Sequence, residues 1–240
     1  MLSSQVRSTD IASGEAAVTR LSNKLAAPPD RCSRPIALTF WIGTLLLMCS
    51  SAAFAADGEK LFAPCVACHG NKGEGNATLN APAIAGQDAG YVERQLRNFR
   101  NRRRGGKSDA LGVQMQAAAA ALADDAAVAQ VASYVSNLPK TVSASPARGN
   151  LHNGNNLYQG TCGACHGGTA EGNPALKAPR LAGLDAPYIK RQFAQFRDGM
   201  RGADPQDTPG RQMAMMAKTL PTERDLDDII AFIHSQGRPK

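Results

Sequence analysis

Two short stretches of this chain pair thiols with an imidazole in the same order. Residues 65–75 read CVACHGNKGEG and residues 162–172 read CGACHGGTAEG. Each stretch opens with two cysteines three positions apart and has a histidine directly after the second. The six side chains are Cys65, Cys68 and His69 in the first stretch and Cys162, Cys165 and His166 in the second. Thiols and imidazoles at this spacing can serve redox chemistry, metal binding or cofactor attachment.

A C-x-x-C pair has three common explanations. A redox dithiol belongs beside strands, and no segment of this chain shows the period-two alternation of a strand. A zinc site would need both cysteine pairs together, yet they lie in separate copies of a repeat, and zinc-ligand spacings are much shorter. The third explanation also uses the histidine, because C-x-x-C-H is the spacing that attaches a c-type haem. The repeated motif therefore predicts two covalently bound haem c groups.

The repeat also selects a second ligand for each haem iron, which in electron-transfer cytochromes is often a methionine. Met115 is the one methionine between residues 56 and 139, and Met213 is its counterpart in the second copy. Both follow the pattern G-x-Q and precede a leucine by seven residues. The predicted axial pairs are therefore His69 with Met115 and His166 with Met213.

Other side chains are weaker candidates for the second ligand. Met215 and Met216 lie out of register, and core filling is the expected role for them. A bis-histidine site would have to use His152 or His234, and neither has a histidine at the matching position of the first copy. We expect His152 in a surface loop and His234 on a helix face.

A proline follows each motif histidine by 13 residues: Pro82 in APAIAG and Pro179 in APRLAG. A ligating imidazole generally donates its other N–H to a carbonyl, which fixes the ring. A rigid proline turn can aim its own carbonyl at the histidine. We expect the two prolines to support the axial histidines, and a simple turn is the alternative.

The duplication extends far beyond the motifs. Residues that coincide at an offset of 97 include Gly75 with Gly172, Tyr91 with Tyr188, Gln95 with Gln192, Phe99 with Phe196 and Arg104 with Arg201. Between the copies, PKTVSASPARGN is almost devoid of apolar residues and is typical of a linker. The sequence thus predicts a first domain at 56–139, a linker at 140–150 and a second domain at 151–240.

The elements that carry these residues are expected to be helices. Apolar residues recur at helical spacing, and Thr222 with Asp225 resembles a capping box. The segments predicted to be helical are 57–62, 89–100, 126–138, 153–158 and 222–235. Each domain has only about 85 residues, a size that often needs a bound cofactor to complete its core. We predict an all-α fold built around the two haems.

The N-terminus has the features of an export signal. An uncharged apolar run covers 36–55, follows Arg31 and Arg34, and ends in the sequence Ala53-Phe54-Ala55. This pattern predicts a secretory signal peptide at 1–55, with an unusually long polar start, that is cleaved after Ala55. A retained membrane anchor is the alternative. Without residues 1–55 the chain keeps 22 Lys and Arg against 17 Asp and Glu, a net charge of +5.

In order along each copy, the patterns C-x-x-C-H, A-P-x-[IL]-A-G, Y-x-x-x-Q-[LF]-x-x-F and G-x-Q-M resemble those of class I c-type cytochromes. The tandem arrangement is similar to the dihaem cytochromes of the cytochrome c4 kind. The resemblance implies two cytochrome c domains related by a pseudo-two-fold axis, with the haem propionates near their interface. It also implies a periplasmic carrier that shuttles single electrons between respiratory donors and an acceptor such as a terminal oxidase.

Two other functions share part of this pattern. One is the dihaem cytochrome subunit of a larger oxidoreductase, such as a sulfide-oxidising flavocytochrome. The other is an enzyme such as a dihaem peroxidase. An enzyme needs an iron with an open position, and two registered methionine ligands argue against one. We therefore expect an electron-transfer protein that has no small-molecule substrate.

The first copy departs from the family pattern in one loop, where Arg102 replaces a glycine. The basic residues there are Arg100, Arg102, Arg103, Arg104 and Lys107. They form either a solvated charged loop or a docking patch for a redox partner with an acidic surface. No aromatic residues are interleaved with them, so nucleic-acid binding is not expected.

Overall fold

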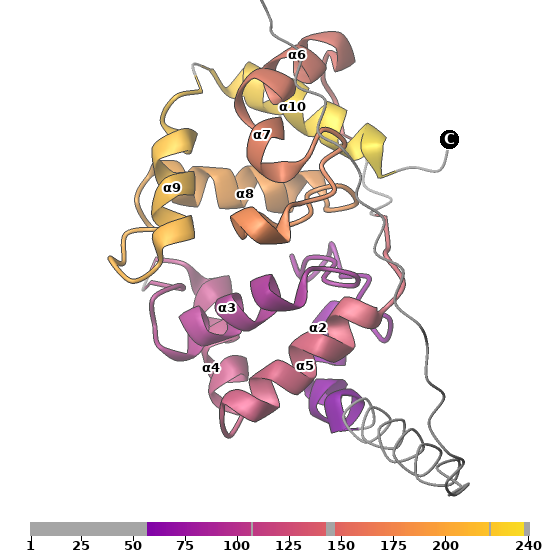
Figure 1. Cartoon of the computed structure of the whole chain (residues 1–240), viewed down its shortest axis with the longest axis vertical. Coiled ribbons are helices and arrows are strands. Elements are labelled where there is room, and N and C mark those ends of the chain that lie inside the picture. The colour runs from indigo at the N-terminus through magenta and orange to yellow at the C-terminus, as the bar shows by residue number, and fades with distance from the viewer. Residues whose placement is uncertain (1–56, 107, 143–146, 221, 238–240) are drawn as a thin grey trace, which may run out of the picture. The chain divides into compact units, whose positions relative to one another are not determined.

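The computed structural model describes residues 57–106, 108–142, 147–220 and 222–237, all within one compact unit (Figure 1). The predicted signal peptide and the middle of the predicted linker lie outside these residues. The regular elements of the described residues are helices, and the β-contacts among them are two isolated bridges. The all-α prediction is therefore confirmed. No helix in the described ranges is long and apolar enough to cross a membrane.

The first half of the structure, residues 57–139, contains a helical segment at 57–62 and five further helical elements. These are η1 (Ala63–Cys65), α2 (Val66–His69), α3 (Ala89–Arg100), α4 (Ala110–Ala120) and α5 (Asp125–Asn137). The three longer helices each begin after an aspartate whose carboxylate accepts a hydrogen bond from a backbone N–H three residues on: Asp88, Asp109 and Asp124. Such caps satisfy donors that the first helical turn leaves free.

The second half, residues 151–237, repeats the order of the α-helices, but its 3-10 helix follows the motif helix instead of preceding it. Its elements are α6 (Leu151–Thr161), α7 (Gly163–His166), η2 (Pro174–Leu176), α8 (Ala186–Arg197), α9 (Thr208–Ala217) and α10 (Glu223–Gln236). Thr222 caps α10 by accepting from the Asp225 N–H at 3.1 Å, which confirms the predicted helix start. His152 lies in the first turn of α6, so the prediction of a surface loop at this residue is wrong.

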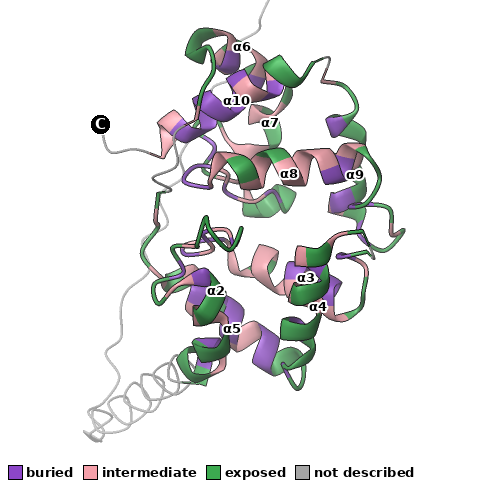
Figure 2. Ribbon diagram, turned by 180° about the vertical axis from the view of Figure 1, so that it is seen from behind, coloured by how far each residue is buried: buried purple, intermediate pink, exposed green. Residues whose placement is uncertain are grey.

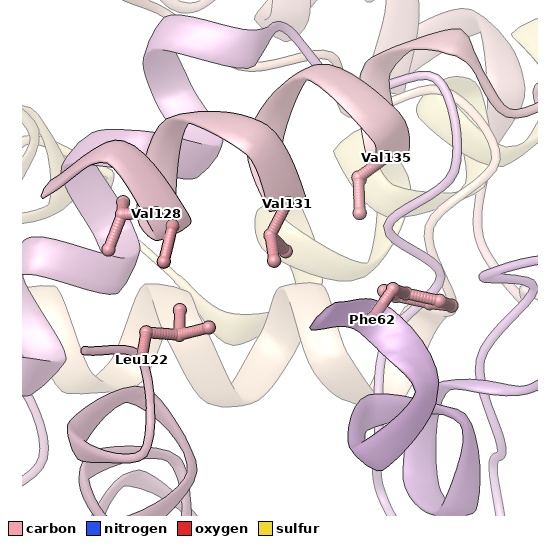
Figure 3. Close-up of a cluster of buried hydrophobic side chains, with 6 residues drawn as sticks. Phe62, Leu122, Val128, Val131 and Val135 are labelled. Carbon is pink, nitrogen blue, oxygen red and sulfur yellow. The ribbon is translucent and has the colours of Figure 1, made fainter. Parts of the chain in front are cut away.

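Each half has its own apolar core, built on one face of its last helix. In the first half Val128, Val131 and Val135 of α5 pack against Phe62 and Leu122 (Figure 3). The matching cluster in the second half combines residues of α6 and α10 with two alanines from the loops between helices. Its members are Tyr158, Ala170, Ala182, Ile229, Phe232 and Ile233. The buried faces of α5 and α10 can be followed in Figure 2.

The first and last helices of each half meet through one phenylalanine and one tyrosine. The rings of Phe62 and Tyr134 are 5.3 Å apart in the first half, and those of Tyr158 and Phe232 are 5.0 Å apart in the second. The two residue types have exchanged places between the halves while the ring contact is kept. Tilted aromatic pairs at such distances stabilise a helix contact beyond the area that they bury.

A glycine brings these helices together. A Cβ added to Gly154 of α6 would lie 1.9 Å from the carbonyl oxygen of Asp228 in α10. A Cβ added to Gly58 would lie 2.6 Å from the carbonyl oxygen of Gln130 in α5. The backbones therefore approach so closely that no larger residue fits at either crossing.

Candidate haem sites

The thiols of each motif lie on and just before a single helical turn. Cys65 ends η1 and Cys68 is in α2, while Cys162 precedes α7 and Cys165 is within it. All four thiols are free; Cys68 and Cys165 are exposed and the other two are half-buried. Burial raises the pKa of Cys65 and of Cys162 above the ordinary thiol value. The described residues contain no group of three His, Cys, Asp or Glu side chains that could hold a metal ion such as zinc.

The motif histidines close these turns with their rings held at one nitrogen. His69 Nδ1 lies 2.9 Å from the carbonyl oxygen of Pro82, and His166 Nδ1 lies 3.0 Å from that of Pro179. A carbonyl can only accept, so Nδ1 carries the proton and Nε2 keeps its lone pair. Burial lowers the pKa of both histidines, although the hydrogen bond opposes the shift. A neutral imidazole with a free Nε2 is the form that binds a metal.

A tight loop brings each proline back to its histidine. The Gly75 N–H donates to the His69 carbonyl at 2.7 Å, and Gly75 has φ = 84° in the left-handed region. A Cβ at Gly75 would lie 2.5 Å from the backbone nitrogen of Ala83, next to Pro82. Glycine is therefore required here both by the dihedral angle and by the close approach of the returning chain.

The structure separates the two registered methionines from the others by exposure. Met115 on α4 and Met213 on α9 are half-buried. The remaining methionines of the described second half are exposed, with fractions of 40% at Met200, 64% at Met215 and 42% at Met216. The interpretation of Met215 and Met216 as core filling is therefore wrong. His234, the other candidate ligand, is buried on α10.

Two arginines are buried where the halves meet. Arg104 is 8% exposed and Arg201 is 6% exposed, and each guanidinium stacks on a phenylalanine of its own half. Neither arginine forms an ion pair within the described residues. Burial and the charge of Arg104 lower the pKa of Arg201. We refer to these two residues as the crossed arginine pair.

The crossed arginine pair is named for its reciprocal hydrogen bonds. Arg104 donates to Gln95 of its own half at 2.7 Å and to Gln192 of the other half at 2.6 Å. Arg201 donates to Gln192 at 2.7 Å and to Gln95 at 2.9 Å. Each arginine also reaches a tyrosine of the opposite half at 3.3 Å, Tyr188 from Arg104 and Tyr91 from Arg201. One glutamine oxygen in each half therefore accepts from both arginines.

These features fit a haem in each half. The free Nε2 of each histidine could serve as an iron ligand, and the paired thiols could serve as the attachment points. Apolar side chains beside the first thiol pair are left half-buried, among them Val66, Ile84, Val92 and Leu96. The Nε atoms of Arg104 and Arg201 are buried without a hydrogen-bond partner in the described part of the chain. A porphyrin would cover the apolar side chains, and its carboxylates would supply the negative charge that the crossed arginine pair lacks.

The arginine-rich loop of the first half is not a free basic patch. Arg100 pairs with Asp125, Arg103 donates to Gln206 of the second half, and Arg104 is buried. Arg102 stays exposed and has φ = 57°, in the left-handed region that Gly199 occupies in the second half. Lys107 lies outside the described residues.

From the sequence, Arg104 is predicted only to belong to a basic loop, and no role is predicted for Arg201 or for the glutamine and tyrosine partners, although all six residues coincide in the repeat. The repeat itself was a signal, because polar and charged residues kept at equal positions of two copies are not explained by an apolar core. The sequence could not show that each arginine contacts the opposite copy, because that contact depends on how the two halves pack.

Comparison with known proteins places both halves in one family. The cytochrome c family model matches residues 55–139 and 151–237. The chain is 34% identical to the thiosulfate dehydrogenase electron acceptor of Stutzerimonas stutzeri (strain A1501), over 70% of this chain and 83% of that protein. It is 32% identical to cytochrome c4 of Azotobacter vinelandii, over 64% of this chain and 77% of that protein.

Solved structures give the same result. The crystal structure of reduced recombinant cytochrome c4 from Pseudomonas stutzeri matches with a TM-score of 0.62 and 27% identity, over 75% of this chain and 97% of that chain. Cys65 with Cys68 and Cys162 with Cys165 fit the haem c attachment motif of these domains. The chain therefore belongs to the cytochrome c family, as a dihaem electron-transfer protein of the cytochrome c4 kind with a covalent haem c in each of two tandem domains.

Proposed function

We propose that this protein is a periplasmic carrier that accepts single electrons from a dehydrogenase and passes them to a terminal oxidase. The observation that carries the proposal is the duplicated histidine geometry, in which each ring is fixed by a proline carbonyl and keeps Nε2 for iron. Two equal sites of this kind suit electron transfer, since a fixed ligand set needs little rearrangement when the iron changes oxidation state.

The residues that would hold the haems follow from the same geometry. Cys65, Cys68, Cys162 and Cys165 would form the thioether bonds, and His69 with Met115 and His166 with Met213 would be the axial ligands. Pro82 and Pro179 would hold the histidine rings. The haem supplies a one-electron iron couple when bound, and a methionine opposite a histidine raises its reduction potential. Two filled axial positions leave no site for a substrate.

Export to the periplasm is part of the proposal. The charge-free run at 36–55 with its Ala-Phe-Ala ending supports a cleaved signal, and c-type haem is attached outside the cytoplasm. The net charge of +5 that remains, with Arg102 exposed, supports a redox partner with an acidic docking surface.

The similarity to a thiosulfate dehydrogenase electron acceptor favours an inorganic sulfur compound as the electron source. The alternative is a permanent subunit of a sulfide-oxidising flavocytochrome. The two differ in whether a second polypeptide stays bound, so purification of the tagged chain from its own cells separates them. A carrier is recovered alone, whereas a subunit brings a flavoprotein in equal amount.

The test of the carrier function uses the purified holoprotein in stopped-flow experiments. Oxidised protein is mixed with thiosulfate dehydrogenase and thiosulfate, and reduced protein is mixed with membranes that contain a terminal oxidase. We expect second-order reduction of both haems in the first mixture and reoxidation in the second. If no oxidase-containing membrane reoxidises the reduced protein, the carrier function is contradicted. If the protein is reoxidised by such membranes but is not reduced by thiosulfate dehydrogenase, only the proposed electron source is contradicted.

A further inference from the structure

A cleft of about 410 Å³ opens where the two halves meet, and neither haem-attachment motif lines it. Its lining is basic, with Arg94, Arg97 and Arg103 from the first half and Lys177 from the second. Asp88 is the one carboxylate among the lining residues, and it is engaged in capping α3. The cleft therefore has four cations against a single anion.

Most of this positive charge is not neutralised by the protein. Arg94 donates to the backbone carbonyl of Lys177 at 2.7 Å, and Arg103 donates to the side-chain oxygen of Gln206. These acceptors are neutral, and neither arginine nor Lys177 forms an ion pair in the described part of the chain. Arg97 differs, since it pairs with two carboxylates at 3.1 and 3.4 Å.

An uncharged donor in the lining also lacks a partner. Asn98 lines the cleft and is only 3% exposed, and its Nδ2 has no hydrogen-bond acceptor among the described residues. A buried amide without an acceptor is costly, so such groups usually mark a bound ligand or water. The missing partner of this amide would be an acceptor, and the cleft that Asn98 lines is rich in cations.

The repeat provides an internal comparison, because each cation of the cleft has a counterpart position in the other half. The counterpart of Arg94 is Arg191, which donates to the Asn80 carbonyl at 2.9 Å just as Arg94 donates to the Lys177 carbonyl. The other cations are not repeated: Arg97, Arg103 and Lys177 correspond to Ala194, Met200 and Asn80. The hydrogen bond from an arginine to a carbonyl of the other half is thus present on both sides of the interface. The cluster of positive charges is present only on the side of the cleft.

We propose that this cleft binds a small oxoanion with two negative charges, such as inorganic phosphate or sulfate, and that the bound anion links the two halves. Arginine and lysine side chains with an amide N–H are the donors that recognise tetrahedral oxoanions. Because Arg94, Asn98 and Arg103 come from the first half and Lys177 from the second, a ligand held by all of them resists their separation. A ligand that binds only the joined halves stabilises the folded protein by mass action.

Calorimetric titration of the holoprotein with inorganic phosphate, at constant ionic strength maintained with chloride, tests the proposal. We expect saturable binding of one anion per chain, accompanied by a higher unfolding midpoint. Arg94→Gln should weaken binding about tenfold or more, since it removes a charged donor. Lys177→Asn should weaken it as well, and asparagine suits the left-handed backbone at Lys177 because Asn80 adopts the same conformation.

Arg191→Gln is the matched control. It removes the equivalent interface hydrogen bond on the other side, so any general weakening of the interface appears in both variants. We expect Arg191→Gln to bind phosphate as the unchanged protein does. Equal loss of binding in the Arg94 and Arg191 variants, or no saturable binding by the unchanged protein, would overturn the proposal. Binding to vesicles of anionic phospholipid that is lost only in Arg94→Gln would overturn it in favour of a lipid headgroup.

Discussion

At the scale of single residues, the structure assigns different tasks to side chains of the same type. Arg102, Arg103 and Arg104 are adjacent, yet one is exposed in a strained backbone conformation, one crosses to the other half, and one is buried on a phenylalanine ring. The methionines divide similarly, because Met115 and Met213 are half-buried while the others in the described residues are exposed. Residue type alone therefore does not define a role here, whereas position in the repeat does.

The methionine assignment leads to a first prediction. Met115→Ala should remove roughly half of the weak near-infrared band of methionine-to-iron charge transfer in the oxidised protein, since one of the two proposed axial methionines is lost. Met213→Ala should remove the other half. Met215→Ala is the control, because Met215 is 64% exposed and lies out of register. An undiminished band in either registered variant would show that another residue binds that iron.

A second prediction concerns the backbone at Arg102. A residue with a side chain in the left-handed region is strained by roughly 1–2 kcal/mol, and Gly199 avoids this strain at the matching position. Arg102→Gly should therefore raise the free energy of unfolding by about 1 kcal/mol, measured by denaturant titration of the holoprotein. The reverse change, Gly199→Arg, should lower it. A loss of stability in Arg102→Gly would mean that the exposed arginine makes a stabilising contact that outweighs the strain.

At the scale of the elements, the sequence predicted helices from an apolar stripe or a cap, but α4, α8 and α9 were not among the predicted segments. The segment 89–100 is α3 to the residue, and the start of α10 follows from Thr222, because helical spacing and caps are local signals. The spacing of 13 residues between each histidine and its proline is also local, and the loop that Gly75 closes brings the two together. The course of residues 101–106 could not be predicted, since it depends on contacts of Arg103 and Arg104 with the second half.

The crossing of α6 and α10 leads to a third prediction. Gly154→Ala would place a methyl group 1.9 Å from the Asp228 carbonyl oxygen, which can be relieved only by moving one helix. We expect a loss of about 1–3 kcal/mol in the free energy of unfolding, typical of overpacking. Gly160→Ala in the same helix is the control, because a Cβ there meets nothing within 4 Å. That variant should gain up to about 1 kcal/mol through helix propensity, and similar effects of the two substitutions would contradict the close crossing.

At the scale of the whole molecule, the crossed arginine pair is one of the hydrogen-bonded contacts that join the two halves. Its two charges are buried, have no ion pair in the described residues, and are held by glutamines from both halves. Because each glutamine oxygen accepts from both arginines, a change at one arginine alters the hydrogen bonding of the other. The two haems should therefore not respond independently to substitutions at this interface.

This leads to a fourth prediction, on reduction potentials. Removal of a buried positive charge favours the more positive oxidised iron, so Arg104→Gln should lower the potentials of both haems. For a one-electron couple, a shift of about 59 mV corresponds to a tenfold change in the equilibrium constant. Spectroscopic redox titration measures the change, and Arg102→Gln is the control because that side chain is exposed to solvent. If only one potential moves, the arginine acts on one domain and the pair does not couple the sites.

The reciprocity of this interface also has a consequence for ancestry. Arg104 binds Gln192 as Arg201 binds Gln95, and Arg94 binds a carbonyl of the second half as Arg191 binds one of the first. Contacts exchanged in this way are those of an isologous dimer, in which one surface is complementary to its own copy. An ancestral gene that encoded a single half would already have specified the whole interface, before any fusion. On this inference, duplication would have joined two subunits that already formed a dimer, and Arg97, Arg103 and Lys177 would have arisen on one side of the interface only after that.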